Sequence, residues 1–450
     1  MNIGEVYDVK IEKLTNLGLG LAKVNNFVVF VNNSCPQDKA RIKITKVNKS
    51  YTNADIIEIL EPSPHRVKPF CPMQKICGAC QLQFIDYEYQ LEIKREIVKD
   101  AMHSIGNLDI DIPKAIPSPV TKAYRHKIQY PVSQTKNSKR ILAGYYKSGT
   151  HDIINIKYCP IQPEICDQIT EFIRENAKNY NICAYDEKSG MGDLRHIVYR
   201  VSTENSKVLV TLVMNNHKLT ADYTNFGKAI YNVFTQICGI CINFNDKKNN
   251  IILGKQTVCV AGEEYIEEKL LNKTFKIGAN TFFQVNPESA ENIFGYVKDY
   301  INNNFKNPLV LDAYAGISAF GICVSDVCSK VVTIEENADS VELAKLTAKE
   351  NNVNNIEIYG GDAAKYFKQE KRKFDVIILD PPRKGCSVLS LNEAVRLSDD
   401  TIIYVSCNPA TLARDLKYLE GKKGCKILSI QPFDMFSHTY HIENVAIIKV

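Results

Sequence analysis

The sequence lacks the segments that mark membrane-spanning and exported proteins. No apolar run approaches the roughly 18 residues that a membrane helix needs. The first residues, MNIGEVYDVKIEK, are charged and contain no apolar signal core, which predicts a cytoplasmic protein with no membrane partner. The 450 residues are 45% apolar and 24% charged, as is typical of a soluble chain of about three domains, and we expect a monomer.

Two glycine-rich phosphate-binding motifs are also missing. The chain contains neither G-x-G-x-x-G nor G-x-x-x-x-G-K-[ST], so a pyrophosphate or triphosphate would lack its cradle. The 15 cysteines are an odd number and follow no secretion signal, which argues against a disulfide scaffold. Clustered cysteines are therefore interpreted as metal ligands or reactive thiols.

The pattern of apolar residues predicts three consecutive domains. Residues 1–60 alternate apolar and polar side chains in short runs, which indicates a small OB-like β-barrel of a kind that often binds single-stranded nucleic acid. Residues 61–275 are typical of an α+β middle domain, with a helix at about 85–110 that we expect to pack on the C-terminal domain. Residues 276–450 predict a doubly wound, Rossmann-like α/β sheet, closed by an antiparallel pair.

Three consecutive strands of the predicted C-terminal sheet end in acidic residues. Asp312 ends the first strand in LDAYAGISAFG, Glu335 ends the second in VVTIEEN, and Asp362 follows the third in IEIYGGD. In such sheets the ligand lies at the carboxyl ends of the strands, where Gly316 allows close approach of the backbone. This arrangement fits a nucleoside cofactor without phosphates, of which S-adenosylmethionine is the common one. The alternative is that these acids are helix caps or surface residues.

The next two strands end in LDPPRKG and YVSCNP. Asp380 ends the first of these, and Arg383 and Lys384 beside it have the charge to hold phosphate. Cys407 stands where the second strand stops, at the same edge of the sheet as the predicted cofactor loop. A cysteine that serves packing would lie within the strand, so this position indicates a reactive thiol.

Three further cysteines lie within ten residues. They are Cys71, Cys77 and Cys80 in CPMQKICGAC, and Cys159, which is followed by proline in KYCPIQ, offers a fourth ligand. Spacing alone fits an iron–sulfur cluster and a four-thiolate zinc site equally well.

Another pair of cysteines is spaced as C-x-x-C in QICGICINF. We interpret Cys238 and Cys241 as two buried strand residues rather than a redox pair, because no thioredoxin-like unit follows this apolar run.

Positive charge is concentrated in residues 121–150, which contain seven Lys and Arg residues and no acidic residue. Arg195 and Arg200 add to it in GDLRHIVYR. A local excess of one sign is how a nearly neutral protein holds a polyanion, so a cradle for a folded RNA loop is predicted. A solvated surface loop is the alternative for residues 121–150.

Four motifs, SCNPATLARDL, LDPPRKG, NTFFQVN and HTYHIENVA, resemble those of the RNA uracil-5-methyltransferases. The resemblance extends over nearly the whole chain, and the N-terminal part resembles their TRAM barrel, an RNA-binding module. Ser318 stands where many members carry glycine, which weakens the predicted cofactor loop. The resemblance implies Cys407 as nucleophile and Glu443 as base, an S-adenosylmethionine site with Gln284, Tyr314, Glu335, Asp362 and Asp380, and a [4Fe–4S] cluster on Cys71, Cys77, Cys80 and Cys159.

The chemistry of that family needs one thiol and one base. A thiolate that adds to C6 of uracil makes C5 nucleophilic toward a methyl group, and a base then removes the C5 proton. The resemblance, with the barrel and the cysteine pattern, favours a uridine of 23S ribosomal RNA as substrate, and the tRNA T-loop is the alternative. A cytosine methyltransferase is less favoured, because Pro382 follows Pro381 where those enzymes carry a second cysteine. Cys407 and Glu443 argue against a non-catalytic RNA-binding or redox-sensing protein.

Overall fold

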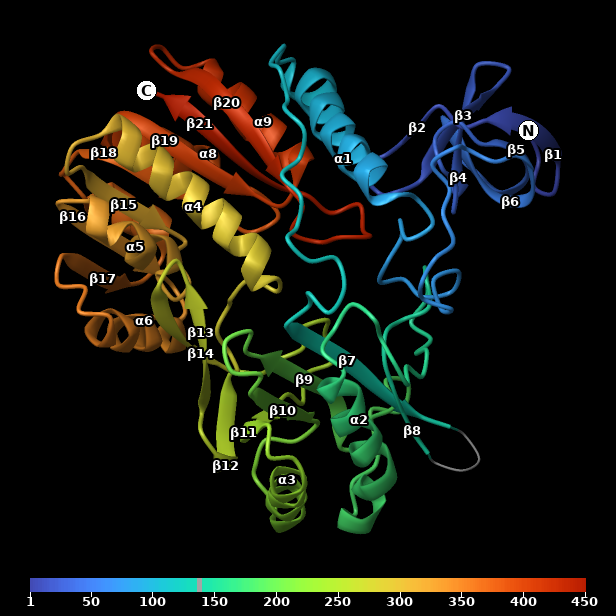
Figure 1. Ribbon diagram of the computed structural model, residues 1–450, viewed down its shortest axis with the longest axis horizontal. Coiled ribbons are helices and arrows are strands. Elements are labelled where there is room, and N and C mark those ends of the chain that lie inside the picture. Colours follow the sequence, from blue (N-terminus) through green and yellow to red (C-terminus); the bar gives the residue numbers. More distant parts are fainter. Residues whose placement is uncertain (136–139) are drawn as a thin grey trace. The chain divides into compact units, whose positions relative to one another are not determined.

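The computed structural model describes residues 1–135 and 140–450 (Figure 1), so two residues of the basic stretch, Lys136 and Lys139, lie outside the described residues. The chain forms two compact units. Unit 1 contains Met1–Ser118, Pro382–Cys386 and Tyr404–Lys449, and unit 2 contains Pro119–Pro381, Ser387–Ile403 and Val450. Unit 1 includes the boundary expected near residue 60 and unit 2 the one expected near residue 275. The division into three consecutive domains stays a prediction.

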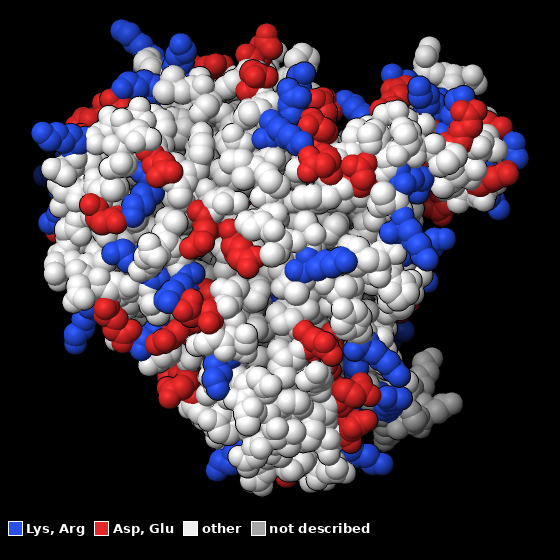
Figure 2. Space-filling view, viewed as in Figure 1, with Lys and Arg blue, Asp and Glu red and all other residues white. Residues whose placement is uncertain are grey.

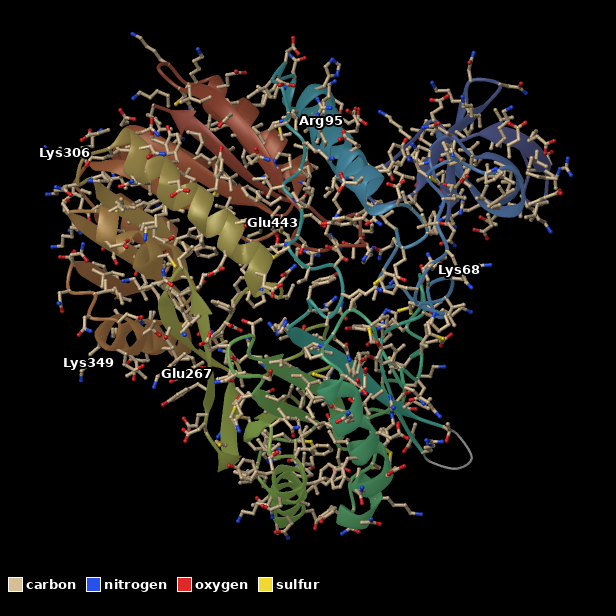
Figure 3. All side chains as sticks on the ribbon, viewed as in Figure 1. Lys68, Arg95, Glu267, Lys306, Lys349 and Glu443 are labelled. Atoms are coloured by element: carbon tan, nitrogen blue, oxygen red, sulfur yellow. The ribbon has the colours of Figure 1, made fainter. Side chains whose placement is uncertain are left out.

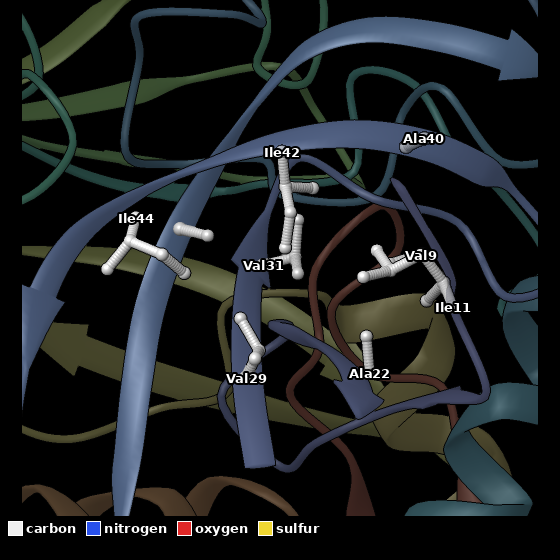
Figure 4. Packing of buried hydrophobic residues seen from close by; sticks show 9 residues of the cluster. Val9, Ile11, Ala22, Val29, Val31, Ala40, Ile42 and Ile44 are labelled. Carbon is white, nitrogen blue, oxygen red and sulfur yellow. The ribbon is translucent and has the colours of Figure 1, made fainter. Parts of the chain in front are cut away.

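The N-terminal strands form one six-stranded sheet in the order β1-β5-β6-β4-β3-β2. Alternate residues of these strands point inward and make a closely packed apolar core (Figure 4). The outer face carries charges of both signs, which are interspersed in Figure 2; Arg41, for example, pairs with Asp8 and Glu58. The strands are β1 Val6–Lys10, β2 Lys13–Leu14, β3 Gly20–Val24, β4 Phe27–Asn32, β5 Lys39–Val47 and β6 Tyr51–Glu61.

The predicted helix after the cysteine-bearing loop is α1, Tyr87–Ala101, which continues as one π-helical turn to Gly106. Asp86 starts it by accepting a hydrogen bond from the Tyr89 amide at 2.9 Å. Apolar residues at four-residue spacing, such as Ile93 and Ile97, are buried on one face. That buried face also carries a lysine, Lys94, which becomes important at the site.

The first sheet of unit 2 has the order β12-β11-β10-β9-β7-β8. All its pairs are antiparallel except β10 with β11, which are joined by helix α3 and run parallel. This mixed sheet agrees with the α+β architecture predicted here. Its elements are β7 Lys127–Gln134, β8 Ile141–Ala143, α2 Ile165–Asn176, β9 Leu194–Val201, β10 Val208–Met214, α3 Ala221–Val233, β11 Ile237–Phe244 and β12 Gln256–Gly262.

A hairpin leads into the predicted Rossmann-like sheet, whose seven strands have the order β17-β16-β15-β18-β19-β21-β20. β15 pairs in parallel with β16 on one side and with β18 on the other, so strand order reverses at β15. β20 and β21 are the predicted antiparallel closing pair. The strands are β13 Tyr265–Leu270 and β14 Lys273–Gly278 of the hairpin, then β15 Leu309–Ala313, β16 Lys330–Glu335, β17 Ile356–Gly360, β18 Phe374–Leu379, β19 Ser398–Ser406, β20 Lys426–Phe433 and β21 Glu443–Lys449.

Helices alternate with these strands. Five of them begin with an Asn, Asp or Ser side chain that accepts a hydrogen bond from the first turn, which explains why these helices start where they do. No helix in the described part of the chain combines the length and the apolar character needed to span a bilayer. The helices are α4 Pro287–Asn304, α5 Ala319–Val324, α6 Ala338–Glu350, α7 Ala363–Gln369, α8 Val388–Leu397 and α9 Pro409–Glu420.

Candidate active site

Cys407 lies in the corner between β19 and α9. Asn408 caps the helix by accepting a hydrogen bond from the Ala410 amide at 3.1 Å, and Pro409 occupies the first helical turn with its fixed φ. The Asn408 amide donates to the Ser406 hydroxyl at 3.2 Å, which closes the corner from the strand side. The thiol thus precedes the positive end of a twelve-residue helix, where a thiolate is favoured.

The segment after Asp380 is fixed against this corner. The carbonyl of Arg383 accepts hydrogen bonds from Asn408 Nδ2 at 3.1 Å and from the Thr411 hydroxyl at 3.2 Å. Gly385 has φ +76°, and a Cβ there would lie 2.5 Å from a carboxylate oxygen of Asp415, so only glycine fits. The glycine of LDPPRKG therefore allows the close approach that sets Arg383 beside the thiol corner.

Glu443, labelled in Figure 3, is the first residue of β21 and is 7% exposed. Its neighbour Asn444 donates a hydrogen bond to the carbonyl of Ser406 at 3.2 Å, and Ser406 directly precedes Cys407. One hydrogen bond thus joins the backbone that carries the predicted nucleophile to the residue beside the predicted base. This contact joins residues that are 38 positions apart in the sequence, and the roles of Cys407 and Glu443 stay predictions.

A pocket of about 210 Å³ opens at Cys407. The barrel contributes to it through the turn between β2 and β3: a Cβ on Gly18 would lie 2.8 Å from the Tyr440 ring. Sequence reasoning missed the barrel residues, because no motif marks them. The lining residues are Asn16, Leu17, Ile97, Arg383, Cys407, Asn408, Pro409, Tyr440, His441 and Ile442.

The segment between β20 and β21 is held by helix α1. Lys94 and Asp434 form an ion pair whose side chains are both fully buried. Tyr87 Oη donates to the Asp434 carboxylate at 2.6 Å, the Ser437 hydroxyl donates to it at 2.8 Å, and Lys94 Nζ donates to the Phe436 carbonyl at 3.0 Å. Burial alone would raise the pKa of Asp434, but the charge of Lys94 and these hydrogen bonds hold it below the ordinary value.

His438 is the turning point of the same segment. It is 6% exposed and has a left-handed backbone with φ +66°. Its amide donates to Gln90 Oε1 at 3.1 Å, and its carbonyl accepts from the Leu82 amide at 2.8 Å. Such a conformation costs a non-glycine residue energy and persists only where neighbours enforce it. His438 is thus a core histidine that shapes the chain leading to Tyr440 and His441.

In unit 2, two carboxylic acids lie at the carboxyl ends of β15 and β18: Asp312 is fully buried and Asp380 is half-buried. Asp312 Oδ2 accepts a hydrogen bond from the Gly321 amide at 2.9 Å, whereas its buried Oδ1 has no partner among the described residues. Burial, with the charges of Asp380 and Glu335, raises the pKa of Asp312 to about 8. Burial raises the pKa of Asp380 to about 7. A bound cation would stabilise the charged form of both acids.

The loop after β15 is held in an unusual conformation. Tyr314, Gly316 and Ser318 have φ of +63°, +57° and +56°, all in the left-handed region. Glu335 Oε2 accepts a hydrogen bond from the Gly316 amide at 2.8 Å, so the acid of β16 fixes the loop of β15. The Ser318 hydroxyl bonds that of Thr333 at 2.8 Å. This bond helps Ser318 to adopt the left-handed conformation that glycine would adopt freely. The loop thus keeps this conformation although a serine stands where many family members carry glycine.

The other two predicted cofactor residues lie on separate elements. Asp362 is exposed and caps α7 by accepting a hydrogen bond from the Lys365 amide at 2.9 Å. Gln284 is half-buried in the loop between β14 and α4. The His126 amide donates to the carbonyl of its neighbour Val285 at 2.7 Å, which anchors that loop on β7. Their contacts with a cofactor stay predictions.

These residues of unit 2 fit S-adenosylmethionine by their chemistry. The orphaned oxygen of Asp312 and the raised pKa of Asp380 suit a cationic sulfonium ligand. Gly316 has nothing within 4 Å of the position of a Cβ, so its backbone is accessible to a nucleoside.

The predicted RNA-binding role of Arg195 and Arg200 is wrong in this structure. Both are 5% exposed on β9, an inner strand of its sheet. Arg195 Nη1 donates to the carbonyls of Asn245 and Lys247 at 2.6 and 2.8 Å, and Arg200 donates to the carbonyl of Thr281. Their charges serve the protein interior and do not reach a polyanion. Arg125 is half-buried, with its guanidinium 5.6 Å from the Tyr145 ring centre.

The predicted metal site is not confirmed. Cys71, Cys77 and Cys80 lie in the irregular segment between β6 and α1, and Cys159 is buried before α2, where its amide donates to Asp167 at 2.9 Å. Within residues 1–135 and 140–450, no group of three or more Cys, His, Asp or Glu side chains is arranged to hold a metal ion.

Comparisons with known proteins agree with this geometry. The family model described as tRNA (Uracil-5-)-methyltransferase matches residues 86–449, and the model of the TRAM domain matches residues 2–57. An uncharacterized RNA methyltransferase of Clostridium tetani is 36% identical over 442 residues, which are 98% of this chain and 95% of that protein. One from Oceanobacillus iheyensis is 37% identical over 451 residues, 99% of this chain and 97% of that protein.

Among solved structures, the tRNA (uracil-54, C5)-methyltransferase of Pyrococcus abyssi in complex with S-adenosyl-L-homocysteine is similar, with a TM-score of 0.77 and 28% identity. The similarity covers 98% of this chain and 99% of that one. These matches confirm the predicted TRAM barrel and methyltransferase fold, and they support S-adenosylmethionine as cofactor. The chain therefore belongs to the tRNA (uracil-5-)-methyltransferase family and is an S-adenosylmethionine-dependent RNA uracil-5-methyltransferase.

Proposed function

We propose that this protein methylates C5 of a uridine in 23S ribosomal RNA in the cytoplasm, with Cys407 as nucleophile and Glu443 as base. The observation that supports the catalytic assignment is the hydrogen bond from Asn444 to the Ser406 carbonyl, because it links the residue after Glu443 to the residue before Cys407. The pocket of about 210 Å³ at Cys407 is small, so it suits one unstacked base and not a duplex.

The residues of the chain divide the reaction between them. The Cys407 thiolate adds to C6 of the uracil, and the electron pair of the C5–C6 double bond becomes nucleophilic density at C5. S-adenosylmethionine supplies a methyl group on a positively charged sulfonium. After C5 is alkylated, Glu443 removes the C5 proton, the C5–C6 double bond re-forms, and the C6–S bond breaks to return the thiolate.

Substitution of the base tests this assignment. Glu443→Gln keeps the shape of the side chain but cannot take the proton, so a covalent protein–RNA adduct should accumulate, visible as a denaturant-resistant band carrying labelled methyl. Cys407→Ala should form neither adduct nor product. If Glu443→Gln turned over normally, another group would be the base.

The target RNA is decided by a separate experiment. The TRAM domain and the cysteine pattern support ribosomal RNA, whereas the similarity to the Pyrococcus abyssi tRNA enzyme favours tRNA as the second candidate. Total RNA from a strain that lacks the gene is incubated with the protein and labelled cofactor, and the 5-methyluridine is mapped. Label in 23S ribosomal RNA supports the first candidate, and label confined to tRNA replaces it by the second.

The proposal also includes a [4Fe–4S] cluster on Cys71, Cys77, Cys80 and Cys159, supported by their spacing and by the resemblance to the family. Anaerobic purification should yield about four iron atoms and four sulfides per chain by analogy with that cluster type. Cys77→Ser should lower both. A protein that keeps zinc and no sulfide would reject the cluster.

A further inference from the structure

Two cysteines face each other across a strand pair in unit 2, and neither is among the residues assigned to methyl transfer. β11 and β12 run antiparallel, and Cys241 lies directly opposite Cys259 in their register. Side chains at directly opposite positions of antiparallel strands are close neighbours on one face of the sheet. Both cysteines also line one cavity. Cys238 is three residues from Cys241 on β11, and strand alternation turns it to the opposite face.

The two thiols differ in reactivity. The hydrogen bond from Cys241 lowers the pKa of Cys259 to about 7, whereas the same bond and burial raise the pKa of Cys241. Cys259 is also the more accessible of the two, since it is half-buried on the edge strand β12 and Cys241 is 1% exposed. The thiolate is the nucleophilic form of cysteine, so Cys259 has the character of an attacking thiol and Cys241 that of a resolving one.

A cavity of about 480 Å³ gives access to the pair. This volume is within the range of small-molecule sites. Its lining includes one cation, Lys255, and three carboxylic acids, so a ligand with both a carboxylate and an ammonium group finds partners for each. These charged residues of the lining are Lys255, Glu264, Asp339 and Glu342.

We propose that Cys241 and Cys259 form a dithiol site that reacts with low-molecular-weight disulfides of amino acids or small peptides. The Cys259 thiolate attacks one sulfur of the small disulfide, whose S–S bond breaks and releases one thiolate. The Cys241 thiol loses its proton, and its sulfur attacks Cys259 in the mixed disulfide, which releases the second thiolate. The protein loses two electrons and two protons and gains a cross-strand disulfide, while the small disulfide is reduced to two thiols.

The site is connected to the loop that carries Gln284. Thr257, two residues from Cys259 on β12, donates its hydroxyl hydrogen to Asn280 Oδ1 at 3.0 Å. Asn243, two residues from Cys241 on β11, donates to the same oxygen at 3.3 Å. Each of the two strands that carry the cysteines thus makes a hydrogen bond to Asn280 of that loop. In both strands the donor is two residues from the cysteine.

The test uses the full chain with glutathione disulfide as the probe and mass as the readout, so its outcome does not depend on methyl transfer. Native reduced protein is exposed to the probe, remaining thiols are alkylated, and peptides are mapped without reduction. We expect a Cys241–Cys259 linked peptide that forms at least tenfold faster than any adduct at Cys183. Cys183 is the matched control, because it is exposed but its pKa is raised by its surroundings and by Asp193.

Two variants separate the roles. Cys241→Ser should trap glutathione on Cys259, because the resolving thiol is gone, and Cys259→Ser should leave Cys241 unmodified. Circular dichroism of both variants confirms that they fold. The proposal is overturned if Cys259 reacts no faster than Cys183 or if Cys241→Ser retains no mixed disulfide. It is also overturned if stoichiometric zinc protects both thiols while the probe leaves them unchanged, which would mark a metal site instead.

Discussion

The two units of the molecule bury carboxylic acids under opposite conditions. In unit 1, Asp434 is fully buried together with Lys94, and its pKa lies below the ordinary value. In unit 2, the buried Asp312 and the half-buried Asp380 have no ion-pair partner among the described residues, and loss of hydration raises their pKa to about 8 and about 7. The charged form of Asp434 is therefore neutralised by the protein itself. The charged forms of Asp312 and Asp380 are disfavoured by the fold alone.

This contrast separates a structural acid from acids that await a ligand. A buried charge that keeps a partner fixes neighbouring segments in place, since losing the partner is very costly. A buried acid without one lowers the stability of the empty protein and becomes favourable when a cation binds. This difference supports our proposal that the cationic sulfonium cofactor binds at Asp312 and Asp380. It also explains why the chain segment at Asp434 is fixed.

Removal of the cation from unit 1 should have the strongest consequence. Lys94→Met removes the counter-charge of the buried Asp434 carboxylate, so we expect a loss of about 3–5 kcal/mol in the free energy of unfolding, measured by urea denaturation. The matched control is Lys114→Met, which removes the solvent-exposed pair of Lys114 with Glu88 and should lower the free energy of unfolding far less. Equal losses in the two variants would mean that burial of the Lys94 pair has no energetic importance.

The pH dependence of the cofactor-free protein should reveal the acids of unit 2. A folded pKa raised from 3.8 to about 7 means that Asp380 favours folding at low pH and that this contribution is lost as pH rises through 7. Asp380→Asn should remove up to about 4 kcal/mol of that loss between pH 4 and pH 8. Asp434, whose pKa is lowered, has the opposite effect on stability. It stabilises the folded protein above about pH 4, and this stabilisation is lost as pH falls. Urea denaturation of the native protein and of Asp380→Asn across this pH range measures how the free energy of unfolding changes with pH. Identical pH dependence in the two proteins would contradict the expectation.

Cofactor affinity should follow the charge of the ligand. Asp380→Asn should weaken binding of S-adenosylmethionine by roughly 10- to 100-fold, the size of a lost hydrogen bond or contact to a charged group. S-adenosylhomocysteine lacks the sulfonium charge, so its affinity should fall less in this variant. Isothermal titration of both ligands measures the two ratios. An equal loss for both ligands would show that Asp380 contributes shape or hydrogen bonding and not charge.

Asp362 should behave as a third kind of acid, exposed and engaged in a helix cap. Asp362→Ala should lower stability by about 1 kcal/mol through loss of the cap on α7, and Asp362→Asn should retain most of it because asparagine caps equally well. Thermal denaturation of the two variants measures this. If the asparagine variant keeps its stability but binds cofactor more weakly, the predicted contact with the adenine is supported.

The sequence was sufficient for the elements that have local signals. Apolar strands followed by Asp312, Glu335 and Asp380 predicted the parallel sheet, and the position of Cys407 at a strand end predicted its place in the structure. Glu443 came only from the resemblance, since one acid among 51 carries no local signal of its own. The structure then placed it beside the thiol corner.

Long-range pairings carry no such signal. Lys94 looked like one more charged residue of an amphipathic helix, and its partner lies 340 residues away. Arg195 and Arg200 looked like surface cations, because a sequence does not show that backbone carbonyls from distant loops will receive them. The barrel residues Asn16 and Leu17 were missed at the Cys407 pocket for the same reason.

The pairing of Lys94 with Asp434 also sets an order of events during synthesis. The N-terminal barrel and α1 emerge from the ribosome early, yet a buried lysine on α1 has no counter-charge until the chain has been made through residue 434. Long sequence separations of this kind slow folding and leave early segments incompletely packed. The thiol pocket, whose lining comes from both ends of the chain, therefore assembles only after most of the polypeptide has been translated.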